Sequence, residues 1–162
     1  MKFKLSAMAL LIAAVFSCSS DKEDGPDYTD TTAITGTWDA TQLETEDPGA
    51  VLQKQILAHL SERDCYILTF TFNEDLSLLA ENGVNYLEVN ATEDGLDIPC
   101  PEERNSDTGT YTYDGEILKI EDLDGPPLNA EVTIEGSRMT IDAKNLDIPN
   151  FDYTGKLIFR KR

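Results

Sequence analysis

From residue 34 onward, short stretches of alternating apolar and polar residues are separated by turn residues. The clearest is CYILTFTFNED (65–75), in which every second side chain from Tyr66 to Phe72 is apolar and Asn73-Glu74-Asp75 then turns the chain. Such alternation is typical of a β-strand with one buried face. Similar patterns predict a strand in ITGTWDATQLE (34–44), two short strands around Asn82-Gly83 in 76–92, and a last strand in 151–162.

Two segments have the pattern of complete hairpins. GTYTYDGEILKIED (109–122) turns at Asp114-Gly115, and NAEVTIEGSRMTIDAKN (129–145) turns at Glu135-Gly136. Between the predicted strands, residues 93–107 form an acidic segment that we expect to be a loop. About eight or nine antiparallel strands in regular succession suit a β-sandwich or an up-and-down barrel, and the meander pattern favours the barrel.

One segment has a different period. In EDPGAVLQKQILAHLSERD (46–64), apolar residues recur at helical spacing after a start marked by Asp47 and Pro48. The residues that share this spacing are Val51, Leu52, Ile56 and Leu60. The pattern predicts one short helix, over 48–62, between the first two strands of an all-β protein.

The first 17 residues have the composition of a signal peptide. Lys2 and Lys4 precede a continuous apolar run from Leu5 to Phe16. A transmembrane helix needs about 20 apolar residues, so the run is too short to span a bilayer and has the length of a secretory h-region. Residues 18–33 carry almost no apolar side chains, which predicts a flexible acidic tether before a single domain at 34–162.

The charge of the chain restricts its partners. The 162 residues carry a formal net charge of −18, which becomes −20 once Lys2 and Lys4 are removed with residues 1–17. An excess of negative charge of this size argues against binding to nucleic acid and against docking on anionic headgroups.

The sequence Val15-Phe16-Ser17-Cys18 resembles the lipobox of bacterial lipoproteins. The resemblance implies that Cys18 is lipidated and becomes the new N-terminus, so that acyl chains anchor the protein to a membrane. The acidic run 21–24 that follows resembles the export signal of surface lipoproteins of the Bacteroidota, although any acidic tether has this composition. Together the two motifs imply an outer-membrane lipoprotein exposed on the cell surface.

If Cys18 carries lipid, Cys65 and Cys100 remain as an even pair in an oxidising compartment. Such a pair predicts a disulfide. Two free buried thiols and half of a metal site are the alternatives; the chain's single histidine and the lack of a CxxC motif count against the metal site.

Three segments resemble the lipocalin-like domains found in lipoproteins of the Bacteroidota: Gly36-Thr37-Trp38, the hairpin GTYTYDGEILKI and the C-terminal LIFRKR. The resemblance covers about residues 34–162 and implies a lipocalin-like barrel. In that family an arginine near the end of the last strand packs over the tryptophan, which here implies Arg160 over Trp38. The helix lies earlier in the chain than the main helix of familiar lipocalins, so it could plug an open end of the barrel.

The candidate binding residues are the apolar members of the alternating strands. They are Tyr66, Leu68, Phe70, Phe72, Tyr111, Tyr113, Met139, Ile141, Leu157 and Phe159. One interpretation is that they fill the barrel as its core. The other is that they line a pocket for a small hydrophobic or amphiphilic ligand, because an eight-stranded barrel holds either side chains or one small ligand.

The sequence predicts no catalytic residue, no metal site and no cofactor. His59 is not associated by sequence with a nucleophile, and Asp122-Leu-Asp124-Gly125 resembles only the start of a calcium loop because Pro126 and Pro127 follow. The function expected is therefore a non-catalytic, lipid-anchored binding protein. The alternative is an envelope accessory protein that docks other proteins through its acidic segments at 93–107 and 121–129.

Overall fold

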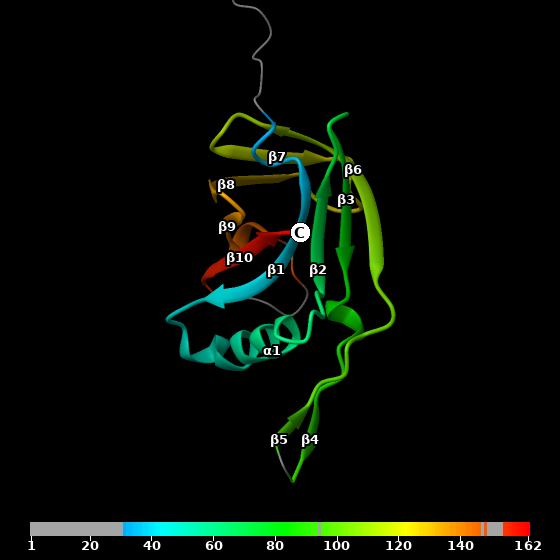
Figure 1. Ribbon diagram of the computed structural model, residues 1–162, viewed down its shortest axis with the longest axis vertical. Coiled ribbons are helices and arrows are strands. Elements are labelled where there is room, and N and C mark those ends of the chain that lie inside the picture. The colour runs from blue at the N-terminus through cyan, green and yellow to red at the C-terminus, as the bar shows by residue number, and fades with distance from the viewer. Residues whose placement is uncertain (1–30, 94, 147, 149–153) are drawn as a thin grey trace, which may run out of the picture.

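Eight antiparallel strands close into a barrel in the computed structural model (Figure 1). The structure describes residues 31–93, 95–146, 148 and 154–162. The barrel strands are β1 (Gly36–Glu44), β2 (Leu68–Phe72), β3 (Ser77–Asn82), β6 (Asn105–Tyr113), β7 (Ile117–Glu121), β8 (Leu128–Glu135), β9 (Arg138–Asp142) and β10 (Lys156–Lys161). Around the barrel they follow the order β1-β10-β9-β8-β7-β6-β3-β2, so the predicted up-and-down barrel is confirmed. The predicted signal peptide and most of the tether, Cys18 included, lie outside the described residues.

The predicted hairpin β6–β7 shows how local chemistry sets the turns. The Asp114 carboxylate accepts hydrogen bonds from the backbone N–H groups of Glu116 and Ile117, and these bonds hold the pKa of Asp114 below its usual value. Gly115 has a φ of 100°, a conformation that favours glycine. The Asp-Gly pair therefore closes the hairpin, which then pairs Tyr113 with Leu118.

The interior of the barrel is filled by large side chains. Phe70 lies 6.0 Å from Phe72 and 5.5 Å from Phe159 between ring centroids, and Phe72 meets Tyr111 edge-on at 4.9 Å. Fully buried aliphatic side chains surround these rings: Leu78, Leu118, Ile120, Met139 and Ile141. This packing agrees with the interpretation in which the alternating apolar residues fill the barrel as its core.

The 3-10 helix η1 (Pro48–Ala50) and the helix α1 (Val51–Ser61) follow β1 and cover one end of the barrel (Figure 1). The predicted apolar face of the helix is partly wrong. Val51 and Leu52 are 48% and 45% exposed, whereas Leu57 and Leu60 are buried against the barrel. In the part of the chain that the structure describes, no helix combines the length and hydropathy needed to cross a membrane.

The predicted hairpin at Asn82-Gly83 is also wrong. The Asn82 side chain accepts a hydrogen bond from the Val84 N–H, and the chain enters the 3-10 helix η2 (Val84–Tyr86) instead of reversing. It then leaves the barrel as β4 (Asn90–Thr92), which pairs with β5 (Gly95–Asp97). The segment 93–107, expected to be a loop, thus contributes β5 and the start of β6.

Candidate functional site

A cavity of about 100 Å³ lies between α1 and the end of the barrel that this helix covers. Ten of its lining residues are apolar and one is polar. They are Ala40, Leu43, Gln53, Ile56, Leu57, Ile67, Leu68, Val84, Leu87, Ile148 and Leu157. A lining of this composition favours an apolar occupant over water.

A β-bulge in β1 shapes one wall of this cavity. Ala40 pairs with Phe159 and Leu43 with Leu157, so the pairing shifts between Ala40 and Gln42. Because residues directly opposite each other share a face of the sheet, the shift keeps both Ala40 and Leu43 on the inner face. The side chain of Ala40 adds little volume to this wall, and Ile56 and Leu57 of α1 line the cavity from the helix side.

The size of the cavity limits what it can hold. Pockets for drug-sized ligands measure about 300–1,000 Å³, whereas an engineered apolar cavity of about 150 Å³ binds benzene or xenon. A cavity of about 100 Å³ therefore fits one small apolar group or one end of a longer molecule.

Gln53 supplies the polar side chain at this cavity. Its Oε1 atom is buried and has no hydrogen-bond partner among the described residues. A buried carbonyl oxygen without a partner costs about 1–3 kcal/mol. The helix side of the cavity thus carries an amide whose hydrogen-bonding capacity is not fully used by the described residues.

Of the ten predicted binding residues, two line the cavity: Leu68 and Leu157. Seven others are buried in the barrel interior, namely Phe70, Phe72, Tyr111, Tyr113, Met139, Ile141 and Phe159. Residues of β1, α1 and η2, together with Ile67, Leu87 and Ile148, complete the lining, and the sequence pattern did not assign them to a binding site. The helical period of Ile56 and Leu60 was the signal that pointed to this end of the barrel.

Tyr66 lies in the segment before β2, which begins at Leu68, so it is not one of the residues on the inner face of that strand. Its hydroxyl donates a hydrogen bond of 3.0 Å to Asp64, and this bond, with partial desolvation, raises the pKa of Tyr66. The guanidinium of Arg162 lies 5.8 Å from the Tyr66 ring centroid. Placing Tyr66 with the pocket residues was therefore wrong, and Ile67 takes that place at the cavity.

Trp38 closes the opposite end of the barrel and is fully buried. Its indole Nε1 donates a 2.6 Å hydrogen bond to the carbonyl oxygen of Ile34. The cation over its ring is Lys161, whose Nζ lies 5.3 Å from the ring centroid. The assignment of Arg160 to this role was wrong by one residue: β10 pairs Lys161 with Trp38 and Arg160 with Asp39, and Arg160 is exposed.

A buried carboxylate lies on the outer face of the same strand. Asp39 is 3% exposed and accepts a 2.8 Å hydrogen bond from the hydroxyl of Thr69. The guanidinium of Arg162 binds both Asp39 oxygens, at 3.0 Å and 2.8 Å, and this pairing raises the pKa of Arg162. The interaction holds the last residue of the chain against β1, which indicates a structural role.

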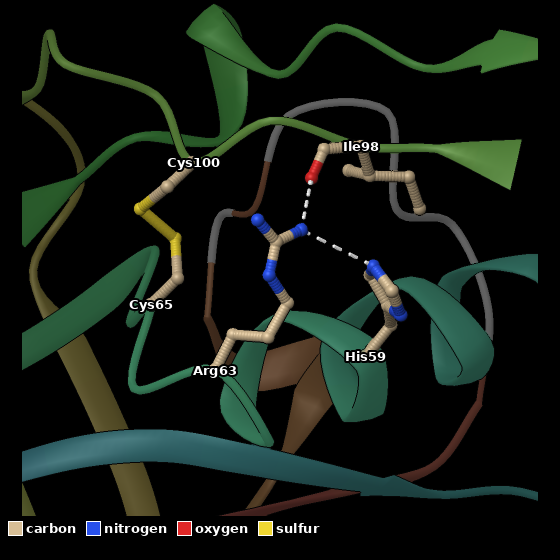
Figure 2. Close-up of a disulfide and its surroundings, with 5 residues drawn as sticks. All are labelled: His59, Arg63, Cys65, Ile98 and Cys100. Carbon is tan, nitrogen blue, oxygen red and sulfur yellow. Dashed lines mark hydrogen bonds between the residues drawn. A yellow bond between two sulfur atoms is a disulfide. The ribbon is translucent and has the colours of Figure 1, made fainter.

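The predicted disulfide between Cys65 and Cys100 is present (Figure 2). Beside it, Arg63 donates hydrogen bonds to the Ile98 carbonyl oxygen at 3.2 Å and to His59 Nε2 at 3.4 Å. His59 thus acts as an acceptor for the side chain of Arg63, which lies just beyond the end of α1. The disulfide and Arg63 together attach the segment after β5 to the end of α1.

The acidic turn at Asp122-Leu-Asp124-Gly125 is held by hydrogen bonds within the protein. Thr110 donates its hydroxyl to Asp122, and the Asp124 N–H donates to the Asp107 carboxylate at 2.6 Å. Among the residues that the structure describes, no group of three or more His, Cys, Asp or Glu side chains is arranged to hold a metal ion.

Comparisons with known proteins give a structural likeness but no match to a family model or a curated protein. The structure is similar to a crystal structure of a lipocalin-like protein from Bacteroides uniformis, with 15% sequence identity and a TM-score of 0.41. The similarity covers 80% of this chain and 99% of that one. Because the TM-score and the identity are both low, the strand pairing of this chain alone defines its fold.

Proposed function

We propose that this chain is a non-catalytic binding protein that takes a small apolar group into the cavity beneath α1. The observation that carries the proposal is the apolar lining of that cavity at the end of a barrel whose interior is otherwise packed. The ligand is either a small hydrophobic molecule or one apolar end of an amphiphile, because about 100 Å³ admits no larger group.

The proposed setting is the cell envelope. A lipocalin-like domain at 34–162 would be held at the outer membrane by lipid on Cys18 and displayed on the cell surface at the end of the 18–33 tether. The motifs of the N-terminal sequence support this placement, as does the disulfide, since disulfides persist in oxidising compartments. Intact mass and lipid release from the protein purified from its own host test the anchor independently of ligand binding.

Titration with straight-chain alcohols of increasing length tests the binding proposal. Each methylene that enters the cavity contributes about 0.8 kcal/mol, so affinity is expected to rise about fourfold per added carbon and then level off once the cavity is full. Methyl NMR would report the binding, with the largest shifts expected at Leu57, Leu68 and Leu157, which line the cavity.

Two substitutions on the same helix separate cavity binding from adsorption to the surface. Leu57→Phe adds volume at the cavity, whereas Val51→Phe adds the same ring on the exposed side of α1. We expect Leu57→Phe to weaken alcohol binding at least about tenfold, a loss of about 1.4 kcal/mol, and Val51→Phe to leave it unchanged. Equal binding by both variants would show that the alcohols do not occupy the cavity.

A further inference from the structure

A two-stranded arm formed by residues 87–98 projects away from the barrel (Figure 1). It contains β4 and β5, and every described residue of these two strands is exposed. The two strands form a separate sheet, so the outer edge of each has no strand partner among the described residues. Isolated two-stranded hairpins are marginally stable in water, so the protein must hold the arm by other means.

The base of the arm is fixed to the helix-covered end of the domain. The disulfide joins Cys100 to Cys65 at the end of α1, and the Arg63 guanidinium donates to the carbonyl oxygen of Ile98 at 3.2 Å (Figure 2). The Ile98 side chain is itself buried. A covalent bond, a charge-assisted hydrogen bond and an apolar contact thus converge on one end of a projecting hairpin.

One face of the arm is apolar. The pairing of β4 with β5 places Ala91 opposite Leu96, and Val89 lies in the segment just before β4. Val89 is 42% exposed and Leu96 is 45% exposed. At the base of the arm, Leu87 directly follows η2 and lines the cavity. Apolar residues therefore lie at the base of the arm, beside the cavity, and also farther along it, where they are exposed.

The charge around this face is negative. Exposed carboxylates lie on the arm and just beyond its base, at Glu88, Glu93, Asp97, Glu102 and Glu103, and the structure gives none of them an ion pair among its described residues. Between residues 84 and 104 the sequence has a single basic residue, Arg104. Like charge disfavours both a second copy of this arm and an anionic membrane surface, and it favours a cationic partner.

We propose that the arm is a docking surface for an extended, basic segment of a second protein. The segment pairs with a free edge of the arm, its apolar side chains contact Val89 and Leu96, and its lysine or arginine side chains meet the carboxylates of Glu88, Glu93 and Asp97. Main-chain hydrogen bonds supply affinity in this mode of recognition, and alternating side chains supply specificity. The proposal does not depend on a ligand in the cavity.

Short synthetic peptides test the proposal with defined probes. A peptide of alternating lysine and valine is expected to bind the intact protein and to shift the NMR signals of Val89, Ala91 and Leu96. A lysine–serine peptide is expected to bind at least about tenfold more weakly, and a glutamate–valine peptide not at all. Binding should weaken with added salt, because the Debye length shortens to about 3 Å at 1 M ionic strength.

Variants of the arm provide the control. Leu96→Ser is expected to lower the affinity for the lysine–valine peptide at least about tenfold. Leu76→Ser changes another exposed leucine, away from the arm, and should leave that affinity unchanged. The proposal is overturned if the two variants bind the lysine–valine peptide with equal affinity, or if the glutamate–valine peptide binds as tightly as the lysine–valine peptide. It is also overturned if, without any peptide, the NMR signal of Leu96 shifts with rising protein concentration or on addition of zwitterionic vesicles. A shift with protein concentration would assign the face to self-association, and a shift with vesicles would assign it to lipid.

Discussion

Replacing both Cys65 and Cys100 with alanine is expected to lower the free energy of unfolding by about 4 kcal/mol. The bond links residues separated by 35 positions, and on the chain-entropy model its loss restores that much conformational freedom to the unfolded chain. Alanine is the appropriate replacement because Cys65 is buried, and serine would bury a hydroxyl there.

Urea unfolding of the oxidised protein and the double variant measures this effect. Hydrogen exchange on the same samples locates it: protection should fall most in the arm of residues 87–98, which the disulfide holds at its base. A variant as stable as the oxidised protein, or one whose loss of protection spares the arm, would contradict the role given to the bond.

Trp38→Ala is expected to destabilise the protein by about 3–5 kcal/mol, the range for removing a buried aromatic side chain from a core. The indole is fully buried, donates to Ile34 at 2.6 Å and closes the barrel opposite α1. Trp38→Phe retains much of the apolar contact but leaves the Ile34 carbonyl oxygen without this donor, so we expect a smaller loss of about 1–3 kcal/mol.

Two neighbouring cations provide a matched control for the tryptophan site. Lys161→Met removes the charge over the ring and should cost about 0.5–1 kcal/mol, whereas Arg160→Met should cost almost nothing because its side chain is exposed. In a double-mutant cycle with Trp38→Leu, which removes the aromatic ring, coupling should appear only for Lys161. Coupling to Arg160 instead would place β10 in a different register.

The strands of the barrel were predictable because their pattern is local. Alternation in 65–75 and the Asp-Gly turn at 114–115 specify a strand and a hairpin almost independently of the rest of the chain. The assignment of Arg160 failed for a non-local reason. Whether residue 160 or residue 161 meets Trp38 depends on how β10 pairs with β1, and a shift of one residue exchanges the two faces of a strand.

The arm and the cavity were missed for different physical reasons. Asn82-Gly83 has the composition of a hairpin turn, but the Asn82 side chain caps Val84 and starts a 3-10 helix. The cavity arises where α1, the bulge at Ala40, the start of β2 and the start of β10 meet. No single segment encodes that space, because it is the volume left after several elements pack together.

A crystal of the protein pressurised with xenon tests the central claim most directly, because xenon enters apolar cavities and can be located by diffraction. We predict one xenon site beneath α1, in contact with Ala40, Leu57 and Leu157, and its loss in Leu57→Phe. Xenon among Phe70, Phe72 and Tyr111, or no xenon beneath α1, would contradict the assignment of that cavity as the binding site.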